Sequence, residues 1–166
     1  MKKIISVFTA LLLVMALAAC GTESGSKDNS NALSFKSGSA ELVMNADASS
    51  ALQALGEAKN TFREESCAGL GYEITYKYPG FELVTYQKEE GQPEYIFRVL
   101  LKDDTVSTAE GVCLGDTAEK VVTTYGTGSA DDAEIEVVRG NCSLDFVMDG
   151  GKVASIEYMA NDAVGG

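Results

Sequence analysis

Residues 72–86 read Tyr-Glu-Ile-Thr-Tyr-Lys-Tyr-Pro-Gly-Phe-Glu-Leu-Val-Thr-Tyr, and this stretch decides the fold. Large apolar residues alternate with polar ones on both sides of the central Pro79-Gly80 pair. Alternation with a period of two indicates a strand with one buried face, and a Pro-Gly pair between two such runs indicates a tight turn. The stretch therefore predicts an antiparallel hairpin over residues 72–86.

The same pattern returns in the second half of the chain. Residues 135–138 and 142–146 are short alternating runs, and Arg139-Gly140-Asn141 separates them as a turn. One further strand is expected to close each half, over residues 95–101 in the first and residues 153–158 in the second. Each half thus predicts an antiparallel meander of three or four strands.

A short helical segment precedes each meander. Residues 42–56 align with residues 112–126, because each stretch holds an apolar run, a turn, about two helical turns with one apolar face, and a glycine. Asp47 and Thr117 are the expected N-caps, and Gly56 and Gly126 are the expected left-handed ends. We therefore expect an α+β fold of two tandem repeats, residues 33–104 and 105–162, each a short helical segment packed on an antiparallel three- to four-stranded meander sheet.

This layout, with Leu55-Gly56 closing one helix and Tyr125-Gly126 closing the other, resembles the β-lactamase-inhibitor-protein-like fold. The tripeptide Gly115-Asp116-Thr117 is similar to the Gly-x-Thr start of the SmpA/OmlA lipoprotein unit. Residues 66–68, 76–78, 80–82, 85–86 and 103–111 together resemble a group of uncharacterised small lipoproteins from Gram-positive anaerobes. The resemblance spans about residues 33–160 and implies a fold rather than a function, since one fold carries many sites.

The N-terminus is typical of an exported lipoprotein. Lys2-Lys3 precedes an apolar run that is too short to span a bilayer comfortably and that ends in Leu17-Ala18-Ala19-Cys20, which resembles a lipobox. We expect residues 1–19 to be a cleaved signal peptide, Cys20 to be lipidated, and residues 20–32 to be a flexible tether without a large apolar residue. Acyl chains such as palmitate would anchor the protein to the cell membrane on its extracytoplasmic side.

Charge and composition exclude several classes of function. Without residues 1–19 the chain keeps eleven lysines and arginines against 25 acids, a formal charge of −14. This charge argues against a nucleic-acid partner and against attraction to anionic headgroups. The chain has no histidine, which removes the commonest general base and zinc ligand, and acidic pairs such as Asp103-Asp104 lack the spacing of a calcium loop. No catalytic residue, metal or cofactor is expected, and the protein is not expected to be an enzyme.

Three cysteines besides Cys20 need an interpretation. The alignment of the halves places Cys113 over Val43 and Cys142 over Phe81, and Val43 and Phe81 are expected to face inward on neighbouring strands. An exported chain permits oxidation, so we expect a Cys113–Cys142 disulfide, with two buried free thiols as the alternative. Cys67 follows two glutamates and has no histidine to activate it, and it is expected to be a small buried hydrophobe.

The remaining candidate site is a face of the first sheet. If Leu83, Val99 and Leu101 point to the core, alternation directs the neighbouring side chains to the opposite face. The expected binding residues are Tyr86, Ile96, Arg98 and Leu100.

An apolar patch that holds a tyrosine and an arginine has the composition of a protein-binding surface. The alternative is that the tether, the C-terminus or the other repeat covers it. The sequence thus predicts a non-enzymatic protein-binding or scaffold lipoprotein. An inhibitor of a secreted hydrolase and a carboxylate-dependent enzyme are the alternatives.

Overall fold

The structure is a computed structural model, and it describes residues 33–66 and 71–161. The expected signal peptide, Cys20, the tether and Cys67 lie outside these residues. The described elements are β1 (Ser34–Ser37), β2 (Ala40–Val43), α1 (Ser49–Leu55), β3 (Asn60–Glu65), β4 (Tyr72–Tyr78), β5 (Phe81–Gln87), β6 (Glu94–Leu101), α2 (Ala118–Tyr125), β7 (Glu134–Arg139), β8 (Cys142–Asp149) and β9 (Lys152–Ala160).

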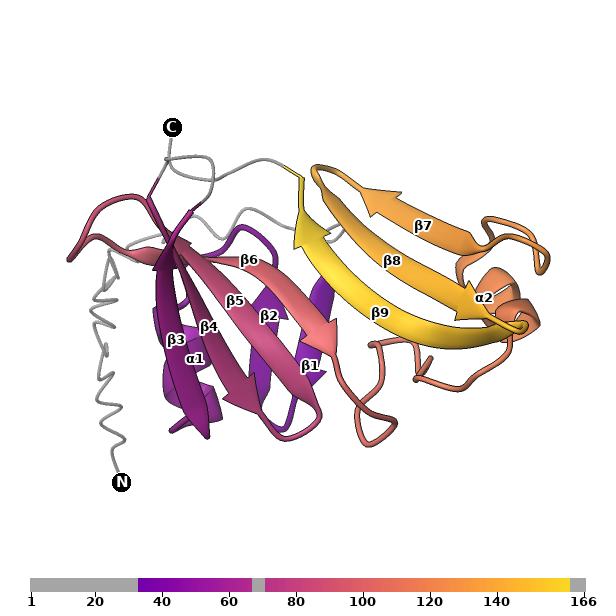
Figure 1. Cartoon of the computed structure of the whole chain (residues 1–166), viewed down its shortest axis with the longest axis horizontal. Helices are drawn as coiled ribbons and strands as arrows, with labels where there is room; N and C mark the ends of the chain where they lie inside the picture. The colour runs from indigo at the N-terminus through magenta and orange to yellow at the C-terminus, as the bar shows by residue number, and fades with distance from the viewer. Residues whose placement is uncertain (1–32, 67–70, 162–166) are drawn as a thin grey trace, which may run out of the picture.

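Seven of the strands form one antiparallel sheet in the order β3-β4-β5-β6-β9-β8-β7, and β1 and β2 form a separate hairpin (Figure 1). The two halves of the chain meet where β6 pairs with β9, with Arg98 opposite Met159 and Leu101 opposite Ile156. A continuous sheet therefore connects the two segments that were expected to be separate repeats.

The prediction of an α+β fold built from two helix-on-sheet repeats is wrong. The described structure is mostly β, with 49% of residues in strands and 12% helical. The helices α1 and α2 have only seven and eight residues, so they are too short to cover a meander each. The boundary expected between residues 104 and 105 lies in the loop between β6 and α2, and strands on both sides of it belong to the same sheet.

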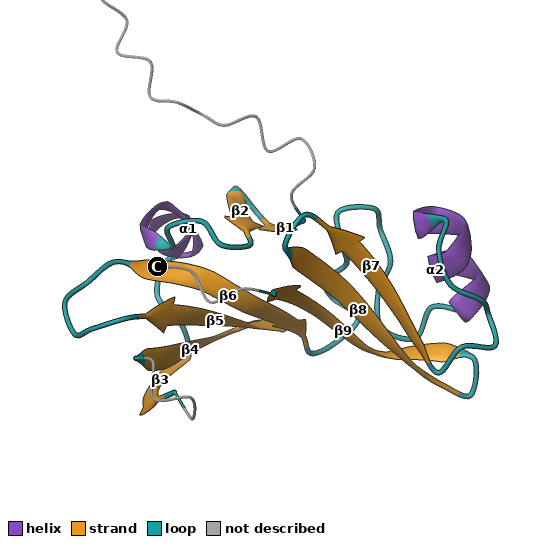
Figure 2. Cartoon of the chain, turned by 90° about the horizontal axis from the view of Figure 1, so that it is seen from above, coloured by secondary structure: helices purple, strands orange, loops and turns teal. Residues whose placement is uncertain are grey.

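Both helices and the β1–β2 hairpin lie on one side of the sheet (Figure 2). Phe35 of β1 packs against Phe81 of β5 and Tyr158 of β9, with ring centroids 4.9 and 6.1 Å apart. All three side chains are at most 1% exposed, and each such burial contributes about 1.5–3 kcal/mol. The hairpin thus closes the core across the seam between β6 and β9.

The hairpins that the sequence predicted are confirmed. In β4–β5, Tyr78 lies opposite Phe81 and Pro79-Gly80 forms the turn. A Cβ atom on Gly80, whose φ is +82°, would lie 2.8 Å from both Thr105 Oγ1 and Val106 Cγ1, so the turn requires glycine. The hairpin β7–β8 turns at Gly140, and its strands are two and three residues longer than expected.

The ends of the helices agree in part with the sequence. Thr117 accepts a hydrogen bond from the Lys120 N–H and Gly126 is left-handed, as predicted for α2. The N-cap of α1 is Ala48. Asp47 instead accepts hydrogen bonds from the Ser49 hydroxyl and from the Ser49 N–H, the latter at 2.8 Å, and both lower the pKa of Asp47. Residue 47 is not the cap because it forms an antiparallel bridge with Tyr95 of β6.

Candidate functional site on the open face of the sheet

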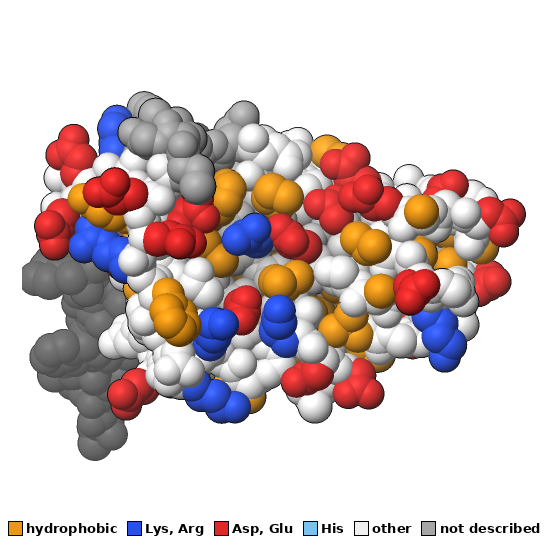
Figure 3. Space-filling model, viewed as in Figure 1, with side chains coloured by type: hydrophobic (Ala, Val, Ile, Leu, Met, Phe, Trp, Pro, Cys, Tyr) orange, Lys and Arg blue, Asp and Glu red, His pale blue; other side chains and the backbone are white. Residues whose placement is uncertain are grey.

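The side of the seven-stranded sheet turned away from α1, α2 and β1–β2 is called the open face (Figure 3). Strand register and alternation assign its side chains. Its central residues are Val84, Tyr86, Arg98, Leu100, Glu136, Asp145, Val147, Glu157 and Met159.

Three of the four predicted binding residues lie on this face. Tyr86 and Leu100 are half-buried there, and Arg98 lies opposite both Val84 of β5 and Met159 of β9. The prediction for Ile96 is wrong, because this side chain is 1% exposed and belongs to the core.

A β-bulge explains the position of Ile96. Val84 lies opposite Arg98 but Thr85 lies opposite Ile96, so Phe97 is an extra residue in β6. An extra residue reverses the alternation beyond it. The Ile96 carbonyl accepts a hydrogen bond from the Asn45 N–H at 2.8 Å, and the Ile96 N–H donates one to the Ala46 carbonyl at 2.9 Å. The sequence of residues 94–101 does not predict this pairing.

A row of acids crosses the second half of the open face. Asp145 on β8 lies directly opposite Glu136 on β7 and opposite Glu157 on β9. Figure 3 shows acidic side chains spread over the β7–β9 half, whereas most of the basic side chains lie over the other half. Burial, together with Glu136, Glu134 and Glu157, raises the pKa of Asp145, although Ser143 donates a hydrogen bond to it at 3.0 Å.

Arg98 borders this row and pairs with it weakly. Its Nη1 lies 3.6 Å from Glu157 Oε1, with both side chains partly exposed. An ion pair of this kind contributes at most about 1 kcal/mol. Arg98 therefore neutralises one end of the row, and the Glu136 end has no cation opposite it in the strand register.

Two polar atoms in the middle of the open face have no hydrogen-bond partner among the described residues. They are Arg98 Nε and Asp145 Oδ1, and both atoms are buried. An unsatisfied buried polar atom costs about 1–3 kcal/mol, and folded proteins retain few of them. These two atoms are themselves shielded, but the Arg98 side chain is 38% exposed and Asp145 is partly exposed, so a cationic and an anionic side chain lie on neighbouring parts of one surface.

Apolar side chains surround these charges. Val84 is 3% exposed beneath its neighbours, and Leu100 and Met159 are half-buried. Val147 on β8 and Val138 on β7 are 44% and 55% exposed. The open face therefore combines an apolar surface with a few fixed charges, as protein-binding surfaces do.

The predicted Cys113–Cys142 disulfide is not formed, because both thiols are free. The turn that holds Cys113 is tied to the start of β9 by a hydrogen bond from Gly115 to Val153, whereas Cys142 lies opposite Ala160 at the other end of β9. The strand between these points spans roughly 20 Å, which no disulfide bridges. The prediction failed because Cys113 lies in a turn and not on a strand.

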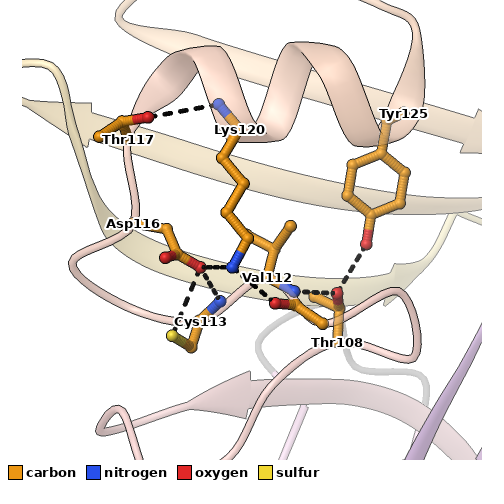
Figure 4. Close-up of polar contacts among 8 residues, drawn as sticks. Thr108, Val112, Cys113, Asp116, Thr117, Lys120 and Tyr125 are labelled. Carbon is orange, nitrogen blue, oxygen red and sulfur yellow. Dashed lines mark hydrogen bonds and ion pairs between the residues drawn. The ribbon is translucent and has the colours of Figure 1, made fainter.

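The surroundings of Cys113 are a second candidate site (Figure 4). Asp116 Oδ2 accepts hydrogen bonds from the Cys113 N–H at 2.8 Å, from Lys120 Nζ at 2.7 Å, and from the Cys113 thiol at 3.4 Å. Lys120 lowers the pKa of Asp116, while burial and Asp116 raise the pKa of Cys113. A thiol kept protonated is a poor nucleophile, so this network stabilises the turn before α2.

Comparison with protein-family models, with curated proteins and with solved structures finds no match for this chain. The resemblance to a lipoprotein family and to the inhibitor-like fold therefore stays a prediction. Within residues 33–66 and 71–161, no helix is long and apolar enough to cross a membrane. The same residues contain no group of three or more acids or cysteines arranged to hold a metal ion.

Proposed function

We propose that this protein is a lipid-anchored, extracytoplasmic binding module that holds another protein on its open face without catalysing a reaction. The proposal rests on one observation, that the partly exposed and oppositely charged Arg98 and Asp145 lie among apolar side chains of the open face. A surface of the second protein would contact the exposed parts of both charged side chains and cover the apolar residues around them.

The charges on the open face indicate the chemistry of that surface. A lysine or arginine of the second protein would reach Asp145 between Glu136 and Glu157, where the acidic row is least neutralised. An acceptor such as a backbone carbonyl would take an N–H from the exposed part of the Arg98 guanidinium. Hydrogen bonds to charged groups contribute about 1.5–3 kcal/mol each, so these contacts favour a basic and apolar surface over an acidic one.

Photocrosslinking in intact cells tests this proposal. A photoreactive amino acid replaces Leu100 on the open face, and the matched control replaces Gln53, which is exposed on α1 on the other side of the sheet. We expect one protein to be crosslinked from position 100 and not from position 53. Arg98→Gln and Asp145→Lys should each reduce the yield about tenfold and shift the melting temperature by a few degrees at most.

Crosslinking of the same proteins from both positions would contradict the proposal, as would an unchanged yield in both variants. A crosslinked protein that is a secreted hydrolase, and whose activity the domain blocks, would favour the inhibitor alternative instead.

Lipidation has its own test. Cys20→Ser should abolish labelling by fatty-acid precursors and release the protein from the membrane fraction, because the acyl chains provide the attachment. Full membrane retention of this variant would contradict the proposed anchor and leave the binding face untouched.

A further inference from the structure

Strands β9, β8 and β7 lie side by side at one end of the sheet (Figure 1). On the open face their side chains form two rows that run across the strands, because directly opposed residues of antiparallel neighbours point to the same side. The acidic row consists of Glu157, Asp145 and Glu136. Two residues away on each strand lies an uncharged row, which consists of Met159, Ser143 and Val138. The surface is therefore uniform in charge across the strands and changes in charge from one row to the next.

The uncharged row is apolar at both of its ends. Val138 on β7 is 55% exposed, and Met159 on β9 is half-buried. Between them Ser143 is 2% exposed, and its hydroxyl donates a hydrogen bond to Asp145 at 3.0 Å. The acidic row thus satisfies the polar group of the uncharged row, and the part of the uncharged row that a partner can contact is apolar.

Two of the three acids lack a cation. Arg98 Nη1 lies 3.6 Å from Glu157, but neither Asp145 nor Glu136 forms an ion pair with another residue in 33–66 or 71–161. Like charges directly opposite one another destabilise a sheet, whereas opposite charges stabilise it. Charge complementarity therefore favours a partner that brings two basic side chains, separated by the distance between neighbouring strands.

The geometry of the two rows favours an α-helix as the element that carries these side chains. The face of a sheet offers side chains and no backbone groups, so an element that covers it must satisfy its own N–H and C=O groups, as a helix does. Neighbouring strands lie about 4.8 Å apart, close to the helical pitch of about 5.4 Å, whereas side chains on one side of an extended segment repeat every ~6.7 Å. Basic residues one helical turn apart thus fall opposite Asp145 and Glu136.

Building on the proposed function, we propose that the partner presents an amphipathic α-helix that lies across β9, β8 and β7. Two basic residues one turn apart face Asp145 and Glu136, and apolar residues cover Met159 and Val138. The rows cross two strand spacings, about 10 Å, which two helical turns span. A helix that ran along the strands would instead set the same side of the partner against both acidic and apolar residues.

Mapping of photocrosslinks in intact cells tests the direction of this helix. A photoreactive amino acid replaces Met159, Val138 or Glu134 in the full-length chain, and mass spectrometry identifies the residue that it reaches in the captured protein. Positions 159 and 138 lie two strands apart, so we expect them to reach residues six or seven positions apart in one helix. Position 134 is the matched control on β7. It lies about 13 Å from position 138 along the strand and should crosslink much less.

A charge exchange tests the basic contacts. Asp145→Lys should lower the crosslinking yield from position 138 about tenfold, because a charge-assisted hydrogen bond becomes a repulsion. Replacing by glutamate the basic residue of the captured protein that lies opposite position 145 should restore the yield with Asp145→Lys alone. Asp149→Lys makes a similar charge change at the exposed end of β8 and should leave the yield unchanged. Recovery in the exchanged pair also shows that Asp145→Lys is folded.

The outcomes separate this inference from the proposed function. If positions 159 and 138 reached the same residue while positions 138 and 134 reached residues four or nine positions apart, the partner element would run along the strands. That result would overturn the helix and leave the proposed binding face intact. An unchanged yield in Asp145→Lys, or no recovery in the exchanged pair, would overturn the basic contacts. The absence of any crosslinked protein from positions 100, 138 and 159 would overturn both the helix and the proposed function.

Discussion

At Asp145, burial and the neighbouring Glu136, Glu134 and Glu157 raise the pKa of a side chain on the open face. The unfolded chain has an aspartate pKa near 3.9, so the folded protein binds the proton more tightly than the unfolded one. The charged form of Asp145 therefore lowers the free energy of unfolding above its folded pKa. This cost disappears below the unfolded pKa, where both states are protonated.

Asp145→Asn should accordingly increase the free energy of unfolding by about 0.5–1 kcal/mol near neutral pH, because two like-charged cross-strand pairs are removed. The gain should vanish as the pH falls toward about 3. Urea denaturation at a series of pH values measures both effects. Asp149→Asn, exposed at the end of the same strand, is the control and should change little. A loss of stability at neutral pH would show that Asp145 is satisfied in the folded protein.

The two cysteines provide a second test at this scale. Burial raises the pKa of both thiols, so a maleimide should label Cys142 slowly and half-buried Cys113 faster in the native protein near pH 7. Both should label fully in denaturant. Mass spectrometry of a non-reduced digest should recover the Cys113 and Cys142 peptides separately, and a linked peptide would contradict the structure.

At the scale of elements, the sequence predicted the turns and a helix cap, but it did not predict which strands pair with one another. The Pro79-Gly80 turn, the Arg139-Gly140-Asn141 turn and the Thr117 cap depend on residues within a few positions of one another. The bulge at Phe97 depends instead on the segment that follows β2, about fifty positions earlier in the chain. The face of the sheet to which side chains point beyond such a bulge therefore cannot be predicted from alternation alone.

Gly80 and Gly140 form a matched pair for testing the turns. Both have positive φ, so alanine at either position meets backbone strain of about 1–2 kcal/mol. Only at Gly80 does the added Cβ also clash with Thr105 and Val106, which adds about 1–3 kcal/mol. Chemical denaturation should therefore find Gly80→Ala clearly less stable than Gly140→Ala. Equal losses would show that the loop over Gly80 moves away freely.

At the scale of the whole molecule, 25 acids and 13 basic residues give a formal charge of −12. Excess charge of one sign opposes the compact state, and salt screens this repulsion as the Debye length falls from about 30 Å at about 10 mM to about 3 Å at about 1 M. We expect the free energy of unfolding to increase over that range of NaCl. Glu136→Gln should make this salt-dependent increase in the free energy of unfolding smaller. If the free energy of unfolding fell with added salt, attractive ion pairs would outweigh the repulsion.

The sequence by itself determined the two hairpins, the positions of the short helices and the inward direction of Leu83, Val99 and Leu101. These features depend on turn residues and on alternation, which act over a few positions. For the same reason it placed Tyr86, Arg98 and Leu100 on the open face.

Only the tertiary structure decided that β6 joins β9 in one sheet, that β1 covers the seam, and that Ile96 turns inward. It also decided that Cys113 and Cys142 lie at opposite ends of β9. Each of these features depends on contacts between segments far apart in the chain. Buried backbone N–H and C=O groups must find partners, and the side chains that favour a strand depend on its neighbours, so the partner of each strand is set by the whole group of strands together.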